Sequence, residues 1–334
     1  MSITIKEIAR LAEVSTATVS MILNKKDKNI SPSTRKRVLS IAKEHHYVPN
    51  NAARSLVTRK TNTIGLIMPD ITNPFFPEIA RGAADKASEA RYSIIYCNSD
   101  DSLKQEKKYI EILTEKMVDG IIFAHAADTE ESFSELSKSK TPIILIDRDY
   151  RNENVKGRVI VDNERGSYTG VNYLIQKGYQ NILYIAGAII TQTAKDRLAG
   201  YKRALRENGI RYDDVLVKSG CYKSEWGYQA MEQFLEEKVS FDAVFCGNDL
   251  IAFGAMKKLK EAGVRVPEDV GVMGFDDIYV SSMMEPALTT VKQPNYEMGY
   301  QAVELLLDVL AGNNAETERK IVLNTELIVR NSTR

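Results

Sequence analysis

The sequence predicts an α/β protein in which a small all-α head precedes a larger core of two lobes, each built on a parallel sheet. Its 334 residues are more than one hydrophobic core usually fills. The first 60 residues show helical periodicity with little strand character, whereas short apolar runs alternate with amphipathic stretches from Thr63 onward. Strands separated by helices are typical of parallel sheets joined by right-handed crossovers.

Charge is distributed unevenly along the chain. Residues 1–60 contain 12 Lys and Arg against four Asp and Glu, so the rest contains 33 bases against 41 acids although the whole chain is neutral. A basic head on an acidic body is typical of a polyanion-binding module joined to a module with another ligand. A solvated basic face explains the same charge, so both interpretations stay open at this point.

Composition excludes other classes of protein. No run approaches the roughly 18 apolar residues of a membrane span, and the opening MSITIKEIAR lacks the apolar core of a secretory signal. We therefore expect a cytoplasmic protein without a membrane partner. Cys97, Cys221 and Cys246 are far apart and belong to no Cys/His cluster, so we expect small buried side chains and no disulfide. The sequence indicates no metal site and no cofactor.

Three short helices are predicted in the head. Apolar residues at 5, 8, 9 and 12 form one stripe of a first helix, and Ser15 caps a second helix over residues 16–23. Ser31 and Pro32 supply the cap and first position of a third helix. On the second helix we expect an inner face of Val19, Ile22 and Leu23 and an outer face of Thr16, Ala17, Ser20 and Met21. A helix-turn-helix of this kind lays its second helix in the DNA major groove.

A marginal helix is predicted between the head and the core. Asn50 is a good cap, but residues 51–57 make barely two turns and are too short to be stable alone in water. Such a helix can fold on DNA, with Leu56 as an apolar wedge between base steps of the minor groove. A plain interdomain linker is the alternative, and the local sequence favours neither.

Nine apolar runs are the candidate strands of the core: 64–68, 93–98, 120–124, 143–147, 159–162, 182–186, 215–218, 243–246 and 270–274. Polar residues follow several of them, at the carboxyl ends where such sheets bind ligands. These residues are Asp70, Asn73, Asp147, Arg148, Asn248, Asp249, Asp276 and Asp277.

An enzyme is not predicted. The chain contains no GxGxxG, GxxxxGKS or GxxxxGKT motif, and His125 has no GxSxG nucleophile motif beside it. Asp, Asn and Arg together with aromatic side chains suit a polyhydroxylated ligand, because Arg and carboxylates bind adjacent hydroxyls while rings cover apolar C–H faces. We therefore predict a binding protein.

Five stretches closely resemble the lactose/galactose repressor family of bacterial transcription regulators. They are TIKEIARLAEVSTATVSMILN, YVPNNAARSL, IGLIMPDITNPFF, GFDDI and LTTVKQP. The resemblance covers residues 3–330. It implies a helix-turn-helix headpiece over 1–48, a hinge helix and linker over 49–61, and an effector-binding and dimerisation core over 62–334, similar to periplasmic sugar-binding proteins. The implied lobes are about 62–161 with 292–322, and about 162–291 with 323–334.

Within the family the chain looks most similar to ribose-operon repressors. The implied effector site comprises Asn73, Phe75, Phe76, Asp147, Arg148, Arg197, Tyr222, Asn248, Asp276 and Gln293. In it the three aromatic rings would enclose a sugar, and Asp147, Arg197 and Asp276 would hold its hydroxyls. The implied DNA-binding residues are Thr4, Ser15, Thr16, Ala17, Thr18, Ser20, Met21, Asn24, Asn50, Ala53, Arg54 and Leu56.

Two positions depart from the family pattern. Ala124 and His125 stand near the place of a ribose-binding Asn, and Met21 stands where Arg is frequent. Met offers a base only apolar contact, so we expect a different operator half-site. No leucine heptads follow the last strand, so we expect a homodimer rather than a tetramer.

The resulting hypothesis is a transcriptional repressor that binds a near-palindromic operator and responds to a small sugar such as ribose. The alternative is a corepressor-type regulator that responds to a purine or a phosphorylated sugar. A transport binding protein is disfavoured by the basic head and the absence of a secretory signal.

Overall fold

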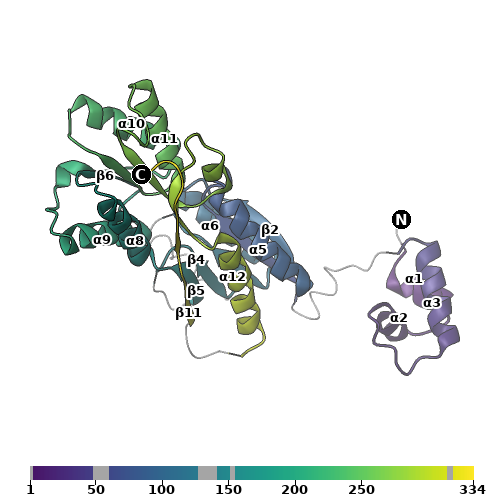
Figure 1. Cartoon of the computed structure of the whole chain (residues 1–334). Helices are drawn as coiled ribbons and strands as arrows, with labels where there is room; N and C mark the ends of the chain where they lie inside the picture. Colours follow the sequence, from purple (N-terminus) through teal and green to yellow (C-terminus); the bar gives the residue numbers. More distant parts are fainter. Residues whose placement is uncertain (1–2, 48–59, 127–140, 151–154, 314–318) are drawn as a thin grey trace. The chain divides into compact units, whose positions relative to one another are not determined.

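The computed structural model of the chain describes residues 3–47, 60–126, 141–150, 155–313 and 319–334 (Figure 1). The chain divides into two compact units, Met1–Thr61 and Asn62–Arg334. The first unit is helical and the second contains all the described strands, as the sequence predicts.

The head contains α1 (Ile5–Leu11), α2 (Thr16–Leu23) and α3 (Pro32–Glu44). Each helix begins at a side chain that accepts a hydrogen bond from a free backbone N–H: Thr4 from Glu7, Ser15 from Thr18 and Ser31 from Thr34. These caps stabilise short helices that would otherwise fray. The predicted bounds of the second helix, 16–23, are confirmed.

A small apolar core holds the three head helices together. It consists of Ile8, Ala9, Ala12, Val19, Ile22, Val38 and Ala42. On α2 the predicted division of faces holds for Val19 and Ile22, which are buried, and for Thr16, Ala17 and Met21, which are exposed. Leu23 and Ser20 are only half-buried, so the prediction was too sharp for these two positions.

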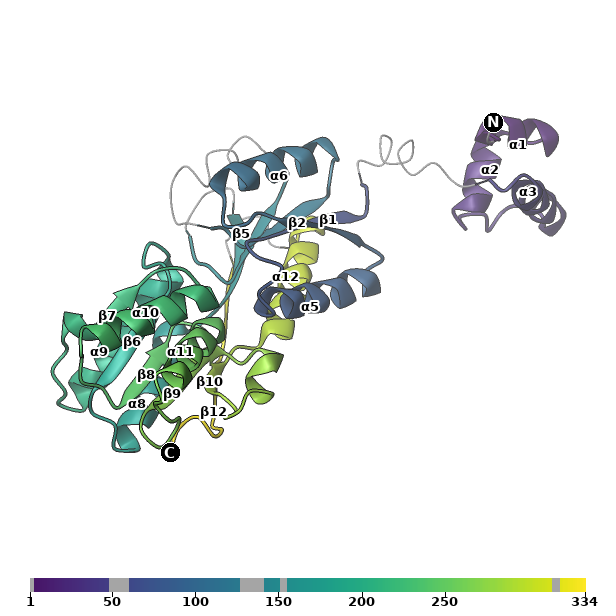
Figure 2. The same cartoon turned by 90° about the horizontal axis from the view of Figure 1, so that it is seen from above.

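The first lobe of the core is built on a six-stranded sheet of order β11-β5-β4-β3-β1-β2. Its described strand pairs are all parallel. The strands are β1 (Thr63–Met68), β2 (Ser93–Asn98), β3 (Gly120–Phe123), β4 (Ile143–Ile146), β5 (Val155–Val161) and β11 (Arg319–Leu323). Helices α5 (Phe75–Glu89) and α12 (Asn295–Leu310) cover one face and α6 (Leu103–Glu115) covers the other (Figure 2).

The second lobe is built on a six-stranded sheet of order β12-β10-β9-β8-β6-β7, in which only β12 runs antiparallel to its neighbour. The strands are β6 (Ile182–Ala186), β7 (Val217–Ser219), β8 (Ala243–Cys246), β9 (Gly271–Asp276), β10 (Thr289–Lys292) and β12 (Glu326–Ile328). One face packs on α8 (Asn163–Gln176) and α9 (Gln192–Glu207), the other on α10 (Ser224–Glu236) and α11 (Asp249–Glu261).

The chain passes between the two sheets three times. It leaves the first lobe after β5 to enter α8, returns after β10 to enter α12, and leaves again between β11 and β12. We call these segments the first, second and third crossovers. Because the lobes are joined only through such short segments, side chains at a crossover belong to neither lobe alone.

The structure corrects several predicted strands. Residues 215–218 divide between a 3₁₀ turn (Asp214–Leu216) and β7, the strand predicted at 143–147 ends at Ile146, and β5 begins four residues before the predicted 159. Strands β10, β11 and β12 were not predicted, because they are short and the last two are largely half-exposed, so none forms an apolar run. Cys97 and Cys246 are buried as expected, but Cys221 is exposed.

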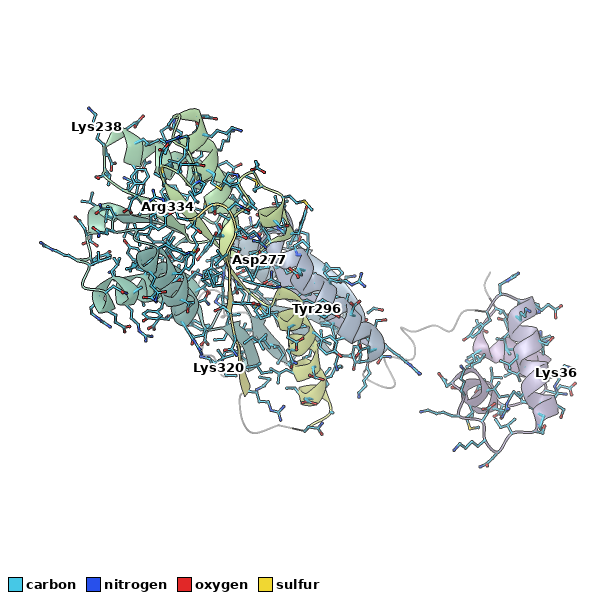
Figure 3. The ribbon with its side chains drawn as sticks, in the orientation of Figure 1. Lys36, Lys238, Asp277, Tyr296, Lys320 and Arg334 are labelled. Carbon is cyan, nitrogen blue, oxygen red and sulfur yellow. The ribbon has the colours of Figure 1, made fainter. Side chains whose placement is uncertain are left out.

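Two glycines allow α5 and α12 to touch although their sequences lie over 200 residues apart. A Cβ atom on Gly82 would lie 1.9 Å from the carbonyl oxygen of Tyr296, and one on Gly299 would lie 1.9 Å from that of Ile79. Figure 3 marks Tyr296 on α12. No side chain fits at such a distance, so this contact between helices depends on glycine at both positions.

Gly82→Ala is therefore expected to lower the free energy of unfolding of the core by about 1–3 kcal/mol, because the added methyl group forces the helices apart. Urea denaturation followed by circular dichroism measures the change. Ser88→Ala, on the exposed face of the same helix, is the control and should leave the midpoint nearly unchanged. Equal effects of the two variants would contradict close packing at Gly82.

Candidate functional site

The ten side chains implied as effector ligands line one cavity within the core, where elements of the two lobes face each other. The empty space around these side chains, open solvent included, is about 510 Å3. Five further residues line the same cavity. Asp70 is one of the polar strand-end residues singled out from the sequence, whereas four were not predicted: Pro69, Asp101, Thr193 and Lys223. The last three lie in loops or on a helix whose sequence carries no motif, so only the structure could bring them to the cavity.

The first lobe contributes an Arg–Asp pair from the loop after β4. Asp147 leaves the strand with a φ of 69°, a left-handed backbone conformation that few residues other than glycine adopt. Arg148 donates through Nη1 to the carbonyl oxygens of His125 and Ala126. Its Nε lies 3.7 Å from Asp147 Oδ2 and its Nη2 lies 3.8 Å from an Asp101 oxygen. The guanidinium is therefore positioned by backbone carbonyls and lies beside two carboxylates.

The second lobe contributes a matching pair. Arg197 of α9 is 3% exposed and donates from Nε to Asn163 Oδ1 at 2.8 Å and from Nη1 to the Gly247 carbonyl at 2.5 Å. Its guanidinium carbon lies 3.8 Å from the centre of the Phe275 ring, and Nη2 lies 3.7 Å from Asp276 Oδ1. A buried cation is thus matched by a carboxylate, two oxygen acceptors and an aromatic face.

Asp276 ends β9 in a strained backbone conformation, with a φ of 115°. Burial raises the pKa of its carboxyl well above the ordinary value, and the nearby Arg197 opposes that rise. One carboxyl oxygen accepts a 2.6 Å hydrogen bond from Gln293 Nε2. Gln293 and Arg197 thus hold the Asp276 carboxyl in the cavity wall, where its oxygens can bind a hydroxyl group of a ligand.

Two buried polar atoms of the cavity have no hydrogen-bond partner in the described part of the chain: Tyr222 Oη and Gln293 Oε1. The Tyr222 ring is fixed against Gly187, where a Cβ atom would lie 2.2 Å from the ring carbon that bears the hydroxyl. Burial also raises the pKa of Tyr222, so its hydroxyl keeps its proton. A buried polar atom without a hydrogen bond lowers the stability of the protein, so each of these atoms needs a partner. This points to a ligand with hydroxyl groups.

The remaining predicted ligands have visible structural partners. Asn73 Oδ1 accepts from the Phe75 N–H at 3.1 Å, in the turn that starts α5, and the Phe75 and Phe76 rings meet edge to face with centres 5.0 Å apart. Asn248 caps α11 by accepting from the Ile251 N–H at 2.9 Å. These contacts place the side chains in the cavity wall by means of the local turns.

The predicted DNA-binding residues of the head divide into two groups. Thr4, Ser15 and Thr18 bond to one another or to nearby backbone at helix starts, and Asn24 Nδ2 donates to the Ser20 carbonyl at 2.8 Å. Thr16, Ala17 and Met21 lie on the exposed face of α2, with Met21 40% exposed. Asn50, Ala53, Arg54 and Leu56 lie outside the described residues.

Sequence reasoning missed a buried carboxyl beside the cavity. Glu106 of α6 is fully buried and accepts a hydrogen bond through Oε1 from the N–H of Ala126, whose carbonyl accepts from Arg148. Burial raises the pKa of Glu106 from its ordinary 4.5 to about 7. The helical periodicity of α6 could have placed this residue on the inner face, but it could not have identified the loop it contacts.

Among the described residues, no helix is long and apolar enough to cross a membrane, and no group of His, Cys, Asp and Glu could hold a metal ion. A compact helical unit with an exposed helix-turn-helix surface and a two-lobed unit with a polar cavity define a class of protein. This class comprises the regulators that bind both DNA and a small ligand.

Comparison with known proteins identifies the family. The family described as "Bacterial regulatory proteins, lacI family" matches residues 4–50, and "Periplasmic binding proteins and sugar binding domain of LacI family" matches residues 61–330. The chain therefore belongs to the LacI family, whose members are transcriptional regulators and not enzymes.

Curated relatives match over nearly the whole chain. The HTH-type transcriptional regulator RegA of Clostridium saccharobutylicum is 41% identical over 335 residues, covering 100% of both chains. The ribose operon repressor of Halalkalibacterium halodurans is 35% identical, covering 99% of this chain and 97% of its own. Among solved structures, the lac repressor dimer bound to operator and the anti-inducer ONPF is 26% identical, covers 100% of this chain and 99% of its own, and has a TM-score of 0.89.

Glu106→Gln should change how stability depends on pH. Below about pH 4.5 the carboxyl is protonated whether the chain is folded or unfolded, so the stability it contributes is fully present. As the pH rises to about 7 the unfolded chain ionises first, and the free energy of unfolding falls by about 3 kcal/mol. The Glu106→Gln side chain cannot ionise. The free energy of unfolding of the variant should therefore fall less than that of the wild type over this pH range, by about the same 3 kcal/mol.

Urea denaturation at a series of pH values measures the effect. Glu111→Gln, on the exposed face of the same helix, is the control and should show the wild-type pH dependence. Parallel pH profiles for the wild type and Glu106→Gln would show that Glu106 titrates normally in the folded state.

Proposed function

We propose that the protein is a homodimeric, cytoplasmic repressor of a sugar-utilisation operon whose operator binding is controlled by a small neutral sugar such as ribose. In this proposal residues 1–48 are the DNA-binding headpiece and 49–61 the hinge helix and linker. Residues 62–334 are the effector-binding and dimerisation core, with lobes of about 62–161 with 292–322, and about 162–291 with 323–334. The proposal rests above all on the convergence of one Arg–Asp pair from each lobe on a single cavity.

The chemistry of the cavity favours a neutral polyhydroxylated ligand over a phosphorylated one. Gln293 Oε1 is an acceptor without a partner in the described residues, so it requires a donor such as a hydroxyl group. A phosphate has only acceptor oxygens at neutral pH and would also meet the carboxyls of Asp147 and Asp276. A sugar hydroxyl, which both donates and accepts, matches all three groups.

Relatives support the DNA-binding and sugar-binding parts of the proposal. One relative is named a ribose operon repressor, and the lac repressor structure holds a dimer on its operator. In this chain the exposed Thr16, Ala17 and Met21 are the α2 side chains best placed to reach base edges. Phosphate contacts from the basic head would then fix the position of α2 without specifying sequence.

Selection of binding sites from random DNA tests the headpiece. We expect a near-palindromic site whose affinity falls steeply with salt, since each neutralised phosphate releases a counterion. Met21→Arg should raise the preference for guanine at one symmetric position in each half-site, by a factor that corresponds to about 1–3 kcal/mol.

Leu39→Arg, at an exposed position of α3, adds the same charge outside α2 and serves as the matched control. It should strengthen binding to all sequences similarly. Selection that returns no palindrome, or an equal change in base preference with both variants, would refute the assignment of α2.

Calorimetry with ribose, other pentoses, hexoses, ribose 5-phosphate and purines tests the cavity. We expect ribose or a related pentose to bind, and Tyr222→Phe to weaken that binding about 5- to 30-fold, since a hydrogen bond contributes about 1–2 kcal/mol. Tyr228→Phe removes a hydroxyl that bonds to Glu261 at the surface, and should have no effect. Heat only with a purine or a sugar phosphate would refute the neutral-sugar assignment and favour the corepressor-type alternative.

A further inference from the structure

We infer that Asn163 is a positioning residue that links occupancy of the cavity to the first crossover between the lobes. The inference rests on the proposed function, because it concerns how a bound sugar changes operator affinity. Asn163 does not line the cavity, so it would act on the ligand only through Arg197.

Asn163 lies at the junction of the two lobes. It is the first residue of α8 in the second lobe, and only Asp162 separates it from the end of β5 at Val161 in the first lobe. Its side chain is 4% exposed, so its amide must find partners within the protein. The backbone at this crossover is further held by Asp162, which accepts from the Arg165 N–H at 2.9 Å.

The Asn163 amide bonds in two directions. Oδ1 accepts from Arg197 Nε at 2.8 Å, a charge-assisted hydrogen bond, and Nδ2 lies 3.5 Å from the Val161 carbonyl oxygen. One end of a single planar group thus contacts a cavity side chain, and the other contacts the last residue of a strand in the opposite lobe. A shift of Arg197 on ligand binding changes the orientation of the amide and therefore its contact with Val161.

Helices α8 and α9 pack closely against each other beside this crossover. Gly200 of α9 lies so close to the start of α8 that a Cβ atom there would be 2.2 Å from the Glu164 carbonyl oxygen. Helices α8 and α9 therefore move together, and a displacement of Arg197 is not absorbed between them. The same helix α9 also reaches the first lobe, where Thr193 Oγ1 donates to the Asp147 carbonyl at 3.3 Å.

A second amide stands in an equivalent place. Gln293 follows β10 at the second crossover and donates through Nε2 to Asp276. Each member of the Arg197–Asp276 pair is thus bonded to an amide at a different crossover. Gln293 lines the cavity and can touch the ligand, whereas Asn163 cannot, so a variant of Asn163 separates coupling from binding.

The test compares operator affinity of the full-length protein with and without saturating ribose. Asn163→Ala removes both bonds, and Asn163→Asp keeps an acceptor for Arg197 but has no N–H for Val161. For both variants we expect the ratio of operator Kd with and without ribose to move towards one by at least about tenfold. For Asn163→Asp, which keeps the acceptor for Arg197, ribose Kd in the absence of DNA should change less than about threefold. By linkage, the effect of operator on ribose affinity must shrink by the same factor.

Asn172→Asp is the matched control, because it makes the same chemical change on α8 where the side chain bonds only to Asn208 among the described residues. Ribose binding measured by calorimetry shows that each variant is folded. If Asn163→Ala does not fold, the result for Asn163→Asp alone tests the inference. A wild-type ratio for Asn163→Asp, in a protein whose wild type responds to ribose, overturns the inference alone. A wild-type operator affinity that does not respond to ribose overturns the proposed function and the inference together.

Discussion

The buried guanidinium of Arg197 is the constraint on which the second lobe's side of the cavity depends. A cation with 3% exposure is tolerated only when its N–H groups and its charge are matched. Its partners come from three separate places, namely Asn163 at the first crossover, Gly247 after β8 and Asp276 at the end of β9. Satisfying one side chain therefore brings the crossover and two strand ends together.

The first lobe repeats this arrangement with Arg148, which is bonded to loop carbonyls and lies beside Asp147. Each lobe therefore contributes one half of the cavity lining, and neither half encloses the cavity alone. Tyr222 Oη and Gln293 Oε1 have no partner among the described residues, and a molecule placed between the halves would supply one. A ligand that bonds to both halves favours one arrangement of the lobes over others, which is the thermodynamic requirement for regulation.

The helices of the head are stabilised in a different way from the cavity. Its core is small, so hydrogen-bonding caps at Thr4, Ser15 and Ser31 contribute a large share of what defines its helices. Because Val19 and Ile22 occupy the inner face of α2, the opposite face is left to Thr16, Ala17 and Met21. The exposed surface of α2 is thus a consequence of how the head buries its few apolar side chains.

The sequence by itself determined the features that depend on neighbouring residues. Ser15 and the apolar spacing after it defined α2, unbroken apolar runs defined the central strands, and motifs shared with a known family indicated ten residues that the structure gathers around one cavity. Tertiary structure alone decided the burial of Glu106, the exposure of Cys221, the edge strands β11 and β12, and the bond between Asn163 and Arg197. These features depend on contacts between residues far apart in the chain, and local periodicity carries no information about such contacts.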